Sequence, residues 1–272
     1  MWRPALIALD LDDTLLNSEG CVSPRSAAAV RAAAREGRRV VVATGSMHHR
    51  AAAFANELGV PGPVISYNGA MLRESDGSWT YHHLPLTPEQ AAAVLRFADG
   101  HGVHANVYVD DVLYIRQCNQ WSELYRSRHH PQMVECPHIE ELTARSPTKI
   151  LLIAEPATIA RLETEGRAEF PGLYVTRSKQ DYLEFVNPQA SKGKALRVLT
   201  EQVLGLSADQ VMAIGDAYND IDMIEYAGLG VAPANAHPEV RARAAHVCAS
   251  NDEDGPAIAI EAVLAGALQP GA

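Results

Sequence analysis

The chain has 272 residues, is 47% hydrophobic and carries a formal net charge of −10 at pH 7. This length and apolar content allow a large buried core and leave room for two compact domains. The negative charge argues against nonspecific binding to nucleic acid or to an anionic membrane surface, because both attract positively charged proteins.

The spacing of the cysteines and the lengths of the apolar runs indicate in which cellular compartment the protein is expected. The four cysteines are scattered without a CxxC spacing, which predicts free thiols in a reducing environment rather than disulfides or a zinc cluster. The apolar run before Asp10 is too short for a signal peptide, and no stretch has the length of a membrane span. We therefore expect a cytoplasmic protein.

The N-terminal part alternates short apolar strands with alanine-rich amphipathic helices. The first helix is marked by Ser23 as its cap, Pro24 at its first position and Gly37 at its end. We predict strands at 5–9, 38–44 and 63–69, with helices at 23–37 and 46–59 between them. This order predicts a parallel sheet with helices on both faces.

Between about Leu72 and Phe185 the sequence becomes rich in strands. Two pairs of runs are separated by only a few polar residues, which is typical of antiparallel hairpins. The expected strands lie at 78–84, 104–109, 112–117, 149–154, 173–178 and 181–186, and the expected helices at 87–100 and 156–170. The segment therefore predicts an inserted α+β domain.

After Asn187 the alternation of helices and parallel strands resumes. We predict strands at 210–215 and 229–233 and helices at 191–205, 219–228, 238–245 and 253–268. The expected fold class is α/β, with a Rossmann-like parallel-sheet core, helices on both of its faces and an inserted α+β domain. We place the core at residues 1–83 and 186–272 and the inserted domain at 84–185.

Polar residues gather where the predicted core strands end. In an open α/β sheet the carboxyl ends of the strands form the ligand crevice, so segments that deliver polar groups there are expected to meet. Four segments do so: Asp10 and Asp12, Thr44 and Gly45, Ser191 and Lys192, and Asp216 with Asn219 and Asp220.

The residue types at this edge suit phosphoryl transfer. Asp10 and Asp12 lie on one side of an extended chain, and Asp216 adds negative charge that a hard cation such as Mg²⁺ would neutralise. The turn after the second strand offers a hydroxyl and helix-start amides, and Lys192 offers a compact positive charge, all suited to a phosphate. Carboxylates, a metal and a phosphate cradle together indicate phosphoryl transfer.

Four motifs of the chain, in this order, resemble those of the haloacid dehalogenase superfamily of phosphatases: "DLDDTLL", "ATGS", "SKGKAL" and "GDAYND". The long insertion between the second and third motifs is similar to that of the Cof-type subfamily, which carries a class IIB cap. "YNGA", "LEFVNPQASKG" and "SNDEDGPAIAI" also resemble Cof-type stretches. The resemblance implies that the inserted domain is a cap that closes over a substrate at the active site.

The resemblance also implies a role for each site residue. Asp10 would be the nucleophile that becomes an aspartyl-phosphate, and Asp12 would protonate the leaving alcohol and then activate water. Mg²⁺ would be held by Asp10, the backbone carbonyl of Asp12 and Asp216. The phosphate would be bound by the Leu11 amide, Thr44, Gly45, Lys192 and Asn219, with Thr14 and Asp220 in support.

Two positions depart from the usual family pattern. Position 13 is Asp where many relatives carry Gly, and Asp tolerates turn geometry. Position 46 is Ser where Cof-type chains usually carry Arg, which removes a guanidinium near the phosphate entrance. Arg50 lies one helical turn further on, and we expect it to substitute in part.

These observations predict a Mg²⁺-dependent phosphatase that hydrolyses small phosphorylated metabolites such as sugar phosphates. We expect a monomer or homodimer without nucleic-acid or membrane partners. A phosphomutase with the same aspartyl-phosphate chemistry is one alternative. A non-catalytic regulator that binds a phosphorylated ligand is another, although a pure binder does not need both Asp10 and Asp12.

Overall fold

A computed structural model describes residues 2–129 and 131–271 and divides the chain into two compact units. The core unit combines the chain up to His82 with the chain from Ser191, and the inserted unit is His83–Ala190. The second change of unit falls a few residues beyond the expected 185/186 boundary. Val186 is still paired with Lys149 in the sheet of the inserted unit, and the chain leaves that sheet only afterwards.

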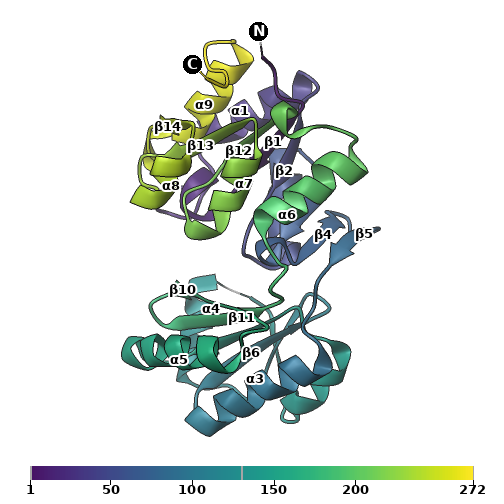
Figure 1. The fold of residues 1–272 in the computed structure, drawn as a ribbon, viewed down its shortest axis with the longest axis vertical. Coiled ribbons are helices and arrows are strands. Elements are labelled where there is room, and N and C mark those ends of the chain that lie inside the picture. Colours follow the sequence, from purple (N-terminus) through teal and green to yellow (C-terminus); the bar gives the residue numbers. More distant parts are fainter. Residues whose placement is uncertain (1, 130, 272) are drawn as a thin grey trace. The chain divides into compact units, whose positions relative to one another are not determined.

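The core unit is built on a parallel sheet of five strands, ordered β14-β13-β12-β1-β2 (Figure 1). The apolar sequences of its central strands are buried on both faces, as expected for a parallel sheet. The strands are β1 (Leu6–Leu9), β2 (Arg39–Val42), β12 (Val211–Ile214), β13 (Leu229–Pro233) and β14 (His246–Cys248). The prediction of a parallel core sheet is confirmed, while β14 was not predicted.

Helices cover both faces of this sheet (Figure 1). Apolar residues of α1 (Pro24–Arg35), α2 (His48–Leu58) and α9 (Gly255–Leu264) pack with Ile7 and Leu9 on one face. Residues of α6 (Lys192–Arg197) and α7 (Ile221–Tyr226) pack with Leu6 and Ala8 on the other. A short α8 (Pro238–Arg243) packs beside α7. Side chains alternate across β1, so one strand supplies both cores.

The ends of the first helices follow the sequence signals. The Ser23 hydroxyl accepts a hydrogen bond from the Ser26 amide at the start of α1, and Pro24 occupies the first helical position. Helix α2 ends at Gly59, whose φ of 75° lies in the left-handed region that glycine adopts without strain. These two caps fix where the helices begin and end relative to strands β1 and β2.

The expected third strand, 63–69, does not extend the parallel ladder. Its first half forms β3 (Pro63–Ser66), which joins β4 (Met71–Glu74) and β5 (Thr80–His83) in a separate three-stranded sheet. Its second half forms a short turn in which Asn68 has a φ of 56°. A left-handed residue reverses the chain, so β4 returns antiparallel to β3. The link to β2 is a single bridge between Ala43 and Ile65.

The inserted unit has a six-stranded sheet, ordered β10-β11-β9-β6-β7-β8, with α3 and α5 packed on one face. Both predicted hairpins are present, and the turn between β6 and β7 has positive φ at Asp110 and Asp111. The strands are β6 (His104–Val109), β7 (Val112–Ile115), β8 (Met133–Glu135), β9 (Lys149–Ile153), β10 (Tyr174–Lys179) and β11 (Tyr182–Val186), and the helices α3 (Pro88–His101), α4 (Gln120–His129) and α5 (Pro156–Glu169). Neither α4 nor β8 was predicted.

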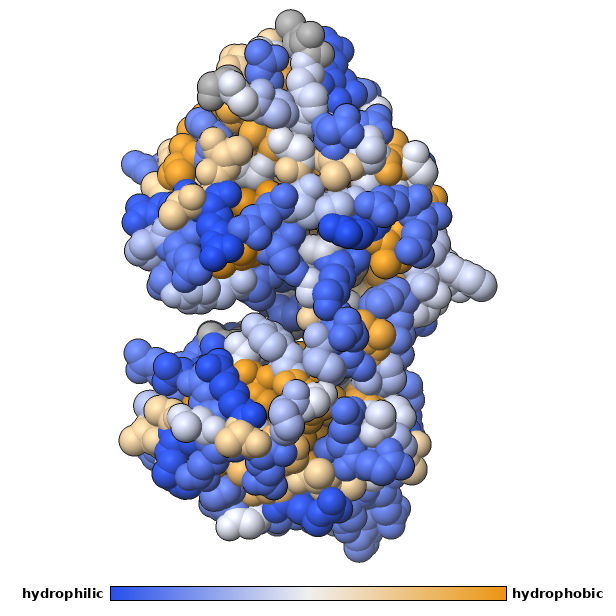
Figure 2. All heavy atoms as spheres, viewed as in Figure 1, coloured by the Kyte–Doolittle hydropathy of each residue, from blue (hydrophilic) through white to orange (hydrophobic). Residues whose placement is uncertain are grey.

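Hydrophilic residues cover most of the visible surface of each unit in Figure 2. The cysteines, all four in the described ranges, are free thiols, as predicted. Within residues 2–129 and 131–271, no helix combines the length and the apolar character needed to cross a bilayer.

Candidate active site

The site begins in the loop that follows β1. Asp10 continues the ladder through its amide, which donates to the Ile214 carbonyl at 3.0 Å. The chain then coils tightly over Leu11–Leu15, with Asp13 at a φ of 60°. Asp reaches this left-handed region more easily than most residues, which explains how Asp replaces the family's usual Gly there. The Asn235 side chain donates to the Asp13 carbonyl at 2.7 Å and holds the turn.

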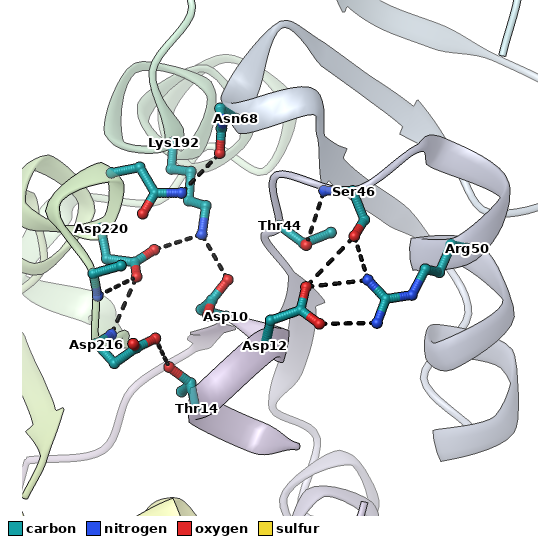
Figure 3. Close-up of polar contacts among 12 residues, drawn as sticks. Asp10, Asp12, Thr14, Thr44, Ser46, Arg50, Asn68, Lys192, Asp216 and Asp220 are labelled. Carbon is teal, nitrogen blue, oxygen red and sulfur yellow. Dashed lines mark hydrogen bonds and ion pairs between the residues drawn. The ribbon is translucent and has the colours of Figure 1, made fainter. Parts of the chain in front are cut away.

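Three carboxylates and one lysine meet beside this loop (Figure 3). One oxygen from each of Asp10, Asp216 and Asp220 lies within 4.8 Å of the others. The Lys192 ammonium donates to Asp10 Oδ1 and to Asp220 Oδ1, both at 2.6 Å. Lys192, Asp10 and Asp220 are buried, and Asp216 is partly buried. Three of the four predicted segments, which are distant in the sequence, therefore converge as the strand-end argument predicts.

Negative charge exceeds positive charge in this cluster. Burial, reinforced by the neighbouring Asp220, raises the pKa of Asp10 well above its ordinary value. The same two causes raise the pKa of Asp216 to about 6. Burial would lower the pKa of Lys192, but Asp10 and Asp220 outweigh it and the pKa is raised. One ammonium facing three carboxylates leaves a charge that a divalent cation would balance, so the donor set fits Mg²⁺.

Asp220 and Thr14 hold the turn that carries Asp216. Asp220 Oδ2 accepts from the amides of Asp216 and Ala217, at 3.1 and 3.0 Å, so it caps the turn before α7. A Cβ on Gly215 would lie 2.5 Å from Asp220, which explains why glycine precedes Asp216. The Thr14 hydroxyl donates to Asp216 Oδ1 at 2.7 Å. Thr14 and Asp220 thus both contact Asp216, through a side-chain oxygen and through its backbone amide.

A second group of polar residues lines the turn after β2. The backbone amide of Asn68 donates to the Thr44 carbonyl at 3.1 Å. The side chain of Asn68 accepts at Oδ1 from Asn219 Nδ2 at 2.8 Å (Figure 3). A Cβ on Gly45 would lie 2.7 Å from Asn68 Oδ1, so a larger residue at position 45 would displace the Asn68 side chain. Asn68 thus links Thr44 with Asn219.

Sequence reasoning missed Asn68. Its signal was the stretch "YNGA", which resembled the family but carried no role. The neighbouring Gly69 has a φ of 87°, and a Cβ there would lie 2.1 Å from the Ser191 carbonyl. The tight turn therefore places Asn68 beside the start of α6, where Lys192 is the first residue.

The Asp12 side chain points away from the acidic cluster, toward α2 (Figure 3). Its two oxygens accept from Arg50, Oδ1 from Nη2 at 2.8 Å and Oδ2 from Nη1 at 3.1 Å. Ser46 Oγ lies 3.5 Å from Asp12 Oδ2 and accepts from Arg50 Nη1. The two aspartates of the first motif thus lie in different surroundings. Asp10 is buried beside Lys192, and Asp12 is exposed beside Arg50.

Fold and site together define a class of protein. A doubly covered parallel sheet carries, at the carboxyl ends of its strands, a buried lysine, an acidic group suited to a hard cation and a polar turn suited to a phosphate. This is the arrangement of an α/β phosphoryl-transfer hydrolase.

Comparison with known proteins identifies the family. The profile of haloacid dehalogenase-like hydrolases matches residues 7–260, and the chain belongs to this family. It is similar to the phosphatase YwpJ of Bacillus subtilis (strain 168), with 31% identity over 93% of this chain and 97% of YwpJ. It is also similar to the pyridoxal phosphate phosphatase YbhA of Escherichia coli (strain K12), with 29% identity over 92% and 94% of the two chains.

A solved structure, the haloacid dehalogenase subclass IIB sugar phosphatase BT4131, has the same fold. It matches 97% of this chain and 99% of its own with a TM-score of 0.83 and 21% identity. The expected superfamily, that of haloacid dehalogenase-like hydrolases, and the expected class of enzyme, a phosphoric monoester hydrolase, are confirmed.

Proposed function

We propose that the protein is a Mg²⁺-dependent phosphatase that hydrolyses small phosphorylated metabolites through an aspartyl-phosphate on Asp10. The observation that carries the proposal is the contact of Lys192 Nζ with Asp10 Oδ1 at 2.6 Å inside the acidic cluster. A carboxylate can attack a phosphate dianion only if their mutual repulsion is cancelled, and a buried ammonium beside the attacking oxygen supports that role.

Asp10 and Asp216, with the backbone carbonyl of Asp12, would hold Mg²⁺, and Asp220 would support them. When bound, the cation would neutralise charge on the phosphoryl oxygens and orient the phosphate. The excess of carboxylates over ammonium in the cluster supports this assignment.

The two aspartates would divide the chemistry. Asp10 Oδ would attack phosphorus while the bond from phosphorus to the leaving oxygen breaks, and Asp12 would give its proton to that oxygen. Asp12, now a carboxylate, would take a proton from water as the water attacks the aspartyl-phosphate. The bond between phosphorus and Asp10 would then break, which releases inorganic phosphate and restores both aspartates.

The polar turns would hold the phosphate during both steps. The Leu11 amide, Thr44 and Gly45 would face its oxygens from the first two loops, and Lys192 and Asn219 from the later segments. The link from Thr44 through Asn68 to Asn219 supports this arrangement, because it fixes two of these groups relative to each other before substrate binds.

Two kinds of substrate deserve the first tests. The expected class is sugar phosphates, and the similar YbhA is named for pyridoxal phosphate. Both are small molecules with a phosphate on an alkyl oxygen. We propose a substrate of this size and chemistry.

The proposal is tested by phosphate release from a panel of sugar phosphates and pyridoxal 5′-phosphate, with Mg²⁺ and with EDTA. We expect Mg²⁺-dependent release concentrated on few compounds and none from Asp10→Asn, whose folding is checked by circular dichroism. An active Asp10→Asn variant would refute the mechanism. Isomerised sugar phosphate without release would indicate a phosphomutase, and ligand binding without any turnover would indicate a regulator.

A further inference from the structure

The contact of Arg50 with Asp12 has no place in the chemistry described so far. Asp12 follows β1 on a loop, and 53% of its side chain is exposed. An exposed aspartate on a loop samples several rotamers unless something restrains it. A proton donor must instead lie within hydrogen-bond reach of the leaving oxygen at the moment of reaction.

We propose that Arg50 is the positioning residue for Asp12, an inference that rests on the proposed function. The guanidinium contacts both oxygens of the Asp12 carboxylate, at 2.8 and 3.1 Å, and such a fork fixes the orientation of the carboxylate plane as well as its position. When one oxygen carries the proton for the leaving group, the other still accepts from Arg50 and keeps the group in place. Arg50 itself stands in the first turns of α2, a helix packed on the core sheet. The restraint therefore comes from a rigid element of the core unit.

Ser46 contacts both members of this pair, Arg50 and Asp12. Its hydroxyl accepts from Arg50 Nη1 and lies at the edge of hydrogen-bond range from Asp12 Oδ2. Its amide donates to Thr44 Oγ1 at 3.1 Å, so the restraint is continuous with the proposed phosphate cradle. Serine at 46 and arginine at 50 thus form one unit.

The test uses leaving groups that differ in their need for a proton. An alkoxide departs slowly unless it is protonated, whereas p-nitrophenolate leaves as a stable anion. We compare kcat/KM for p-nitrophenyl phosphate with kcat/KM for the alkyl phosphate of the panel that turns over fastest. This constant covers steps up to the departure of the leaving group, so later hydrolysis of the aspartyl-phosphate does not enter.

We expect Arg50→Ala to lower kcat/KM for the alkyl phosphate about 10- to 100-fold, the cost of a misplaced catalytic group. For p-nitrophenyl phosphate we expect a loss of less than about threefold, because the step needs little proton donation. Arg50→Lys should fall between wild type and Arg50→Ala, since an ammonium cannot contact both oxygens in a fork. Ser46→Ala should also lower kcat/KM for the alkyl phosphate relative to kcat/KM for p-nitrophenyl phosphate, by a smaller factor.

Arg25→Ala is the matched control. Arg25 also contacts both oxygens of a carboxylate, that of Glu261, at 3.1 and 2.7 Å, and lies in the same unit on α1. We expect Arg25→Ala to change neither of the two kcat/KM values. Equal losses on both substrates from Arg50→Ala, or no loss on either, would overturn the positioning role. A wild-type protein that hydrolyses neither substrate would instead refute the proposed function itself.

Discussion

Lys192 in the core unit and Lys149 in the inserted unit are both buried against carboxylates, but the charge around them differs. Lys149 Nζ lies 3.3 Å from Glu184 Oε2 and 4.9 Å from the centre of the Tyr108 ring. The two side chains form a buried ion pair of one ammonium and one carboxylate, whose charges are equal and opposite. Lys192 contacts two carboxylates at 2.6 Å, with Asp216 beside them.

This difference separates a structural pair from a site. A balanced buried pair has its charge satisfied inside the protein, whereas a cluster with excess carboxylates keeps a negative charge that bound protons or a further cation would neutralise. The pKa of Asp216, raised to about 6 by burial and by Asp220, reflects that excess. The contrast can be tested by removing each lysine, by titrating the cluster, by adding the cation and by replacing the balanced pair.

Lys192→Met should have the largest effect. It leaves Asp10 and Asp220 buried without their ammonium, and breaking a buried ion pair in this way costs about 3–5 kcal/mol. We expect the free energy of unfolding, measured in urea, to fall by that amount, and phosphate release to be lost. Release close to the wild-type rate would show that Lys192 is not needed at the reacting carboxylate and would remove the main support for the proposed mechanism.

The second test is the pH dependence of stability in EDTA. The folded protein binds the Asp216 proton more tightly than the unfolded chain, because its pKa is about 6 instead of 3.8. Ionisation of Asp216 therefore costs stability as pH rises from about 4 to 7, by roughly 3 kcal/mol. Asp216→Asn lacks this titration but keeps an oxygen for Thr14. We expect its stability relative to wild type to rise across that window, and a flat difference would contradict the raised pKa.

Addition of Mg²⁺ should reduce the repulsion among the carboxylates of Asp10, Asp216 and Asp220. A cation that binds only the folded state stabilises it by about 2.7 kcal/mol at a hundred times its dissociation constant. We therefore expect Mg²⁺ to raise the melting temperature of the wild-type protein relative to EDTA in a concentration-dependent way. Asp216→Asn should show a much smaller rise. An equal rise in both proteins would place the bound cation elsewhere.

The sequence predicted the residues at the strand ends because strand direction alone decides where they lie. Asp10, Lys192 and Asp216 follow from the order of strands and helices, without any knowledge of side-chain contacts. The same reasoning placed Thr44 and Asn219. The parallel core sheet and both hairpins were predictable for the same reason, since hydrophobic period and turn residues are local signals.

Contacts that depend on two turns meeting in space were not predictable. Asn68 reaches Asn219 only because left-handed residues at 67–69 fold the chain against α6. Arg50 was expected to replace an arginine near the phosphate, yet its guanidinium lies on Asp12, a partner set by the loop after β1. Lys149 and Glu184 meet through the register of two antiparallel strands, β9 and β11.

The smallest effect is expected where the charge is already balanced. Lys149→Met alone should destabilise the protein, because Glu184 loses its buried ammonium. The double substitution Lys149→Met with Glu184→Leu removes both charges and keeps apolar volume, and such replacements are often neutral or stabilising. We expect its free energy of unfolding to lie within about 1 kcal/mol of wild type or above it. A double variant as unstable as the single one would show that this pair is more than a balanced structural contact, and the distinction drawn between the two lysines would fail.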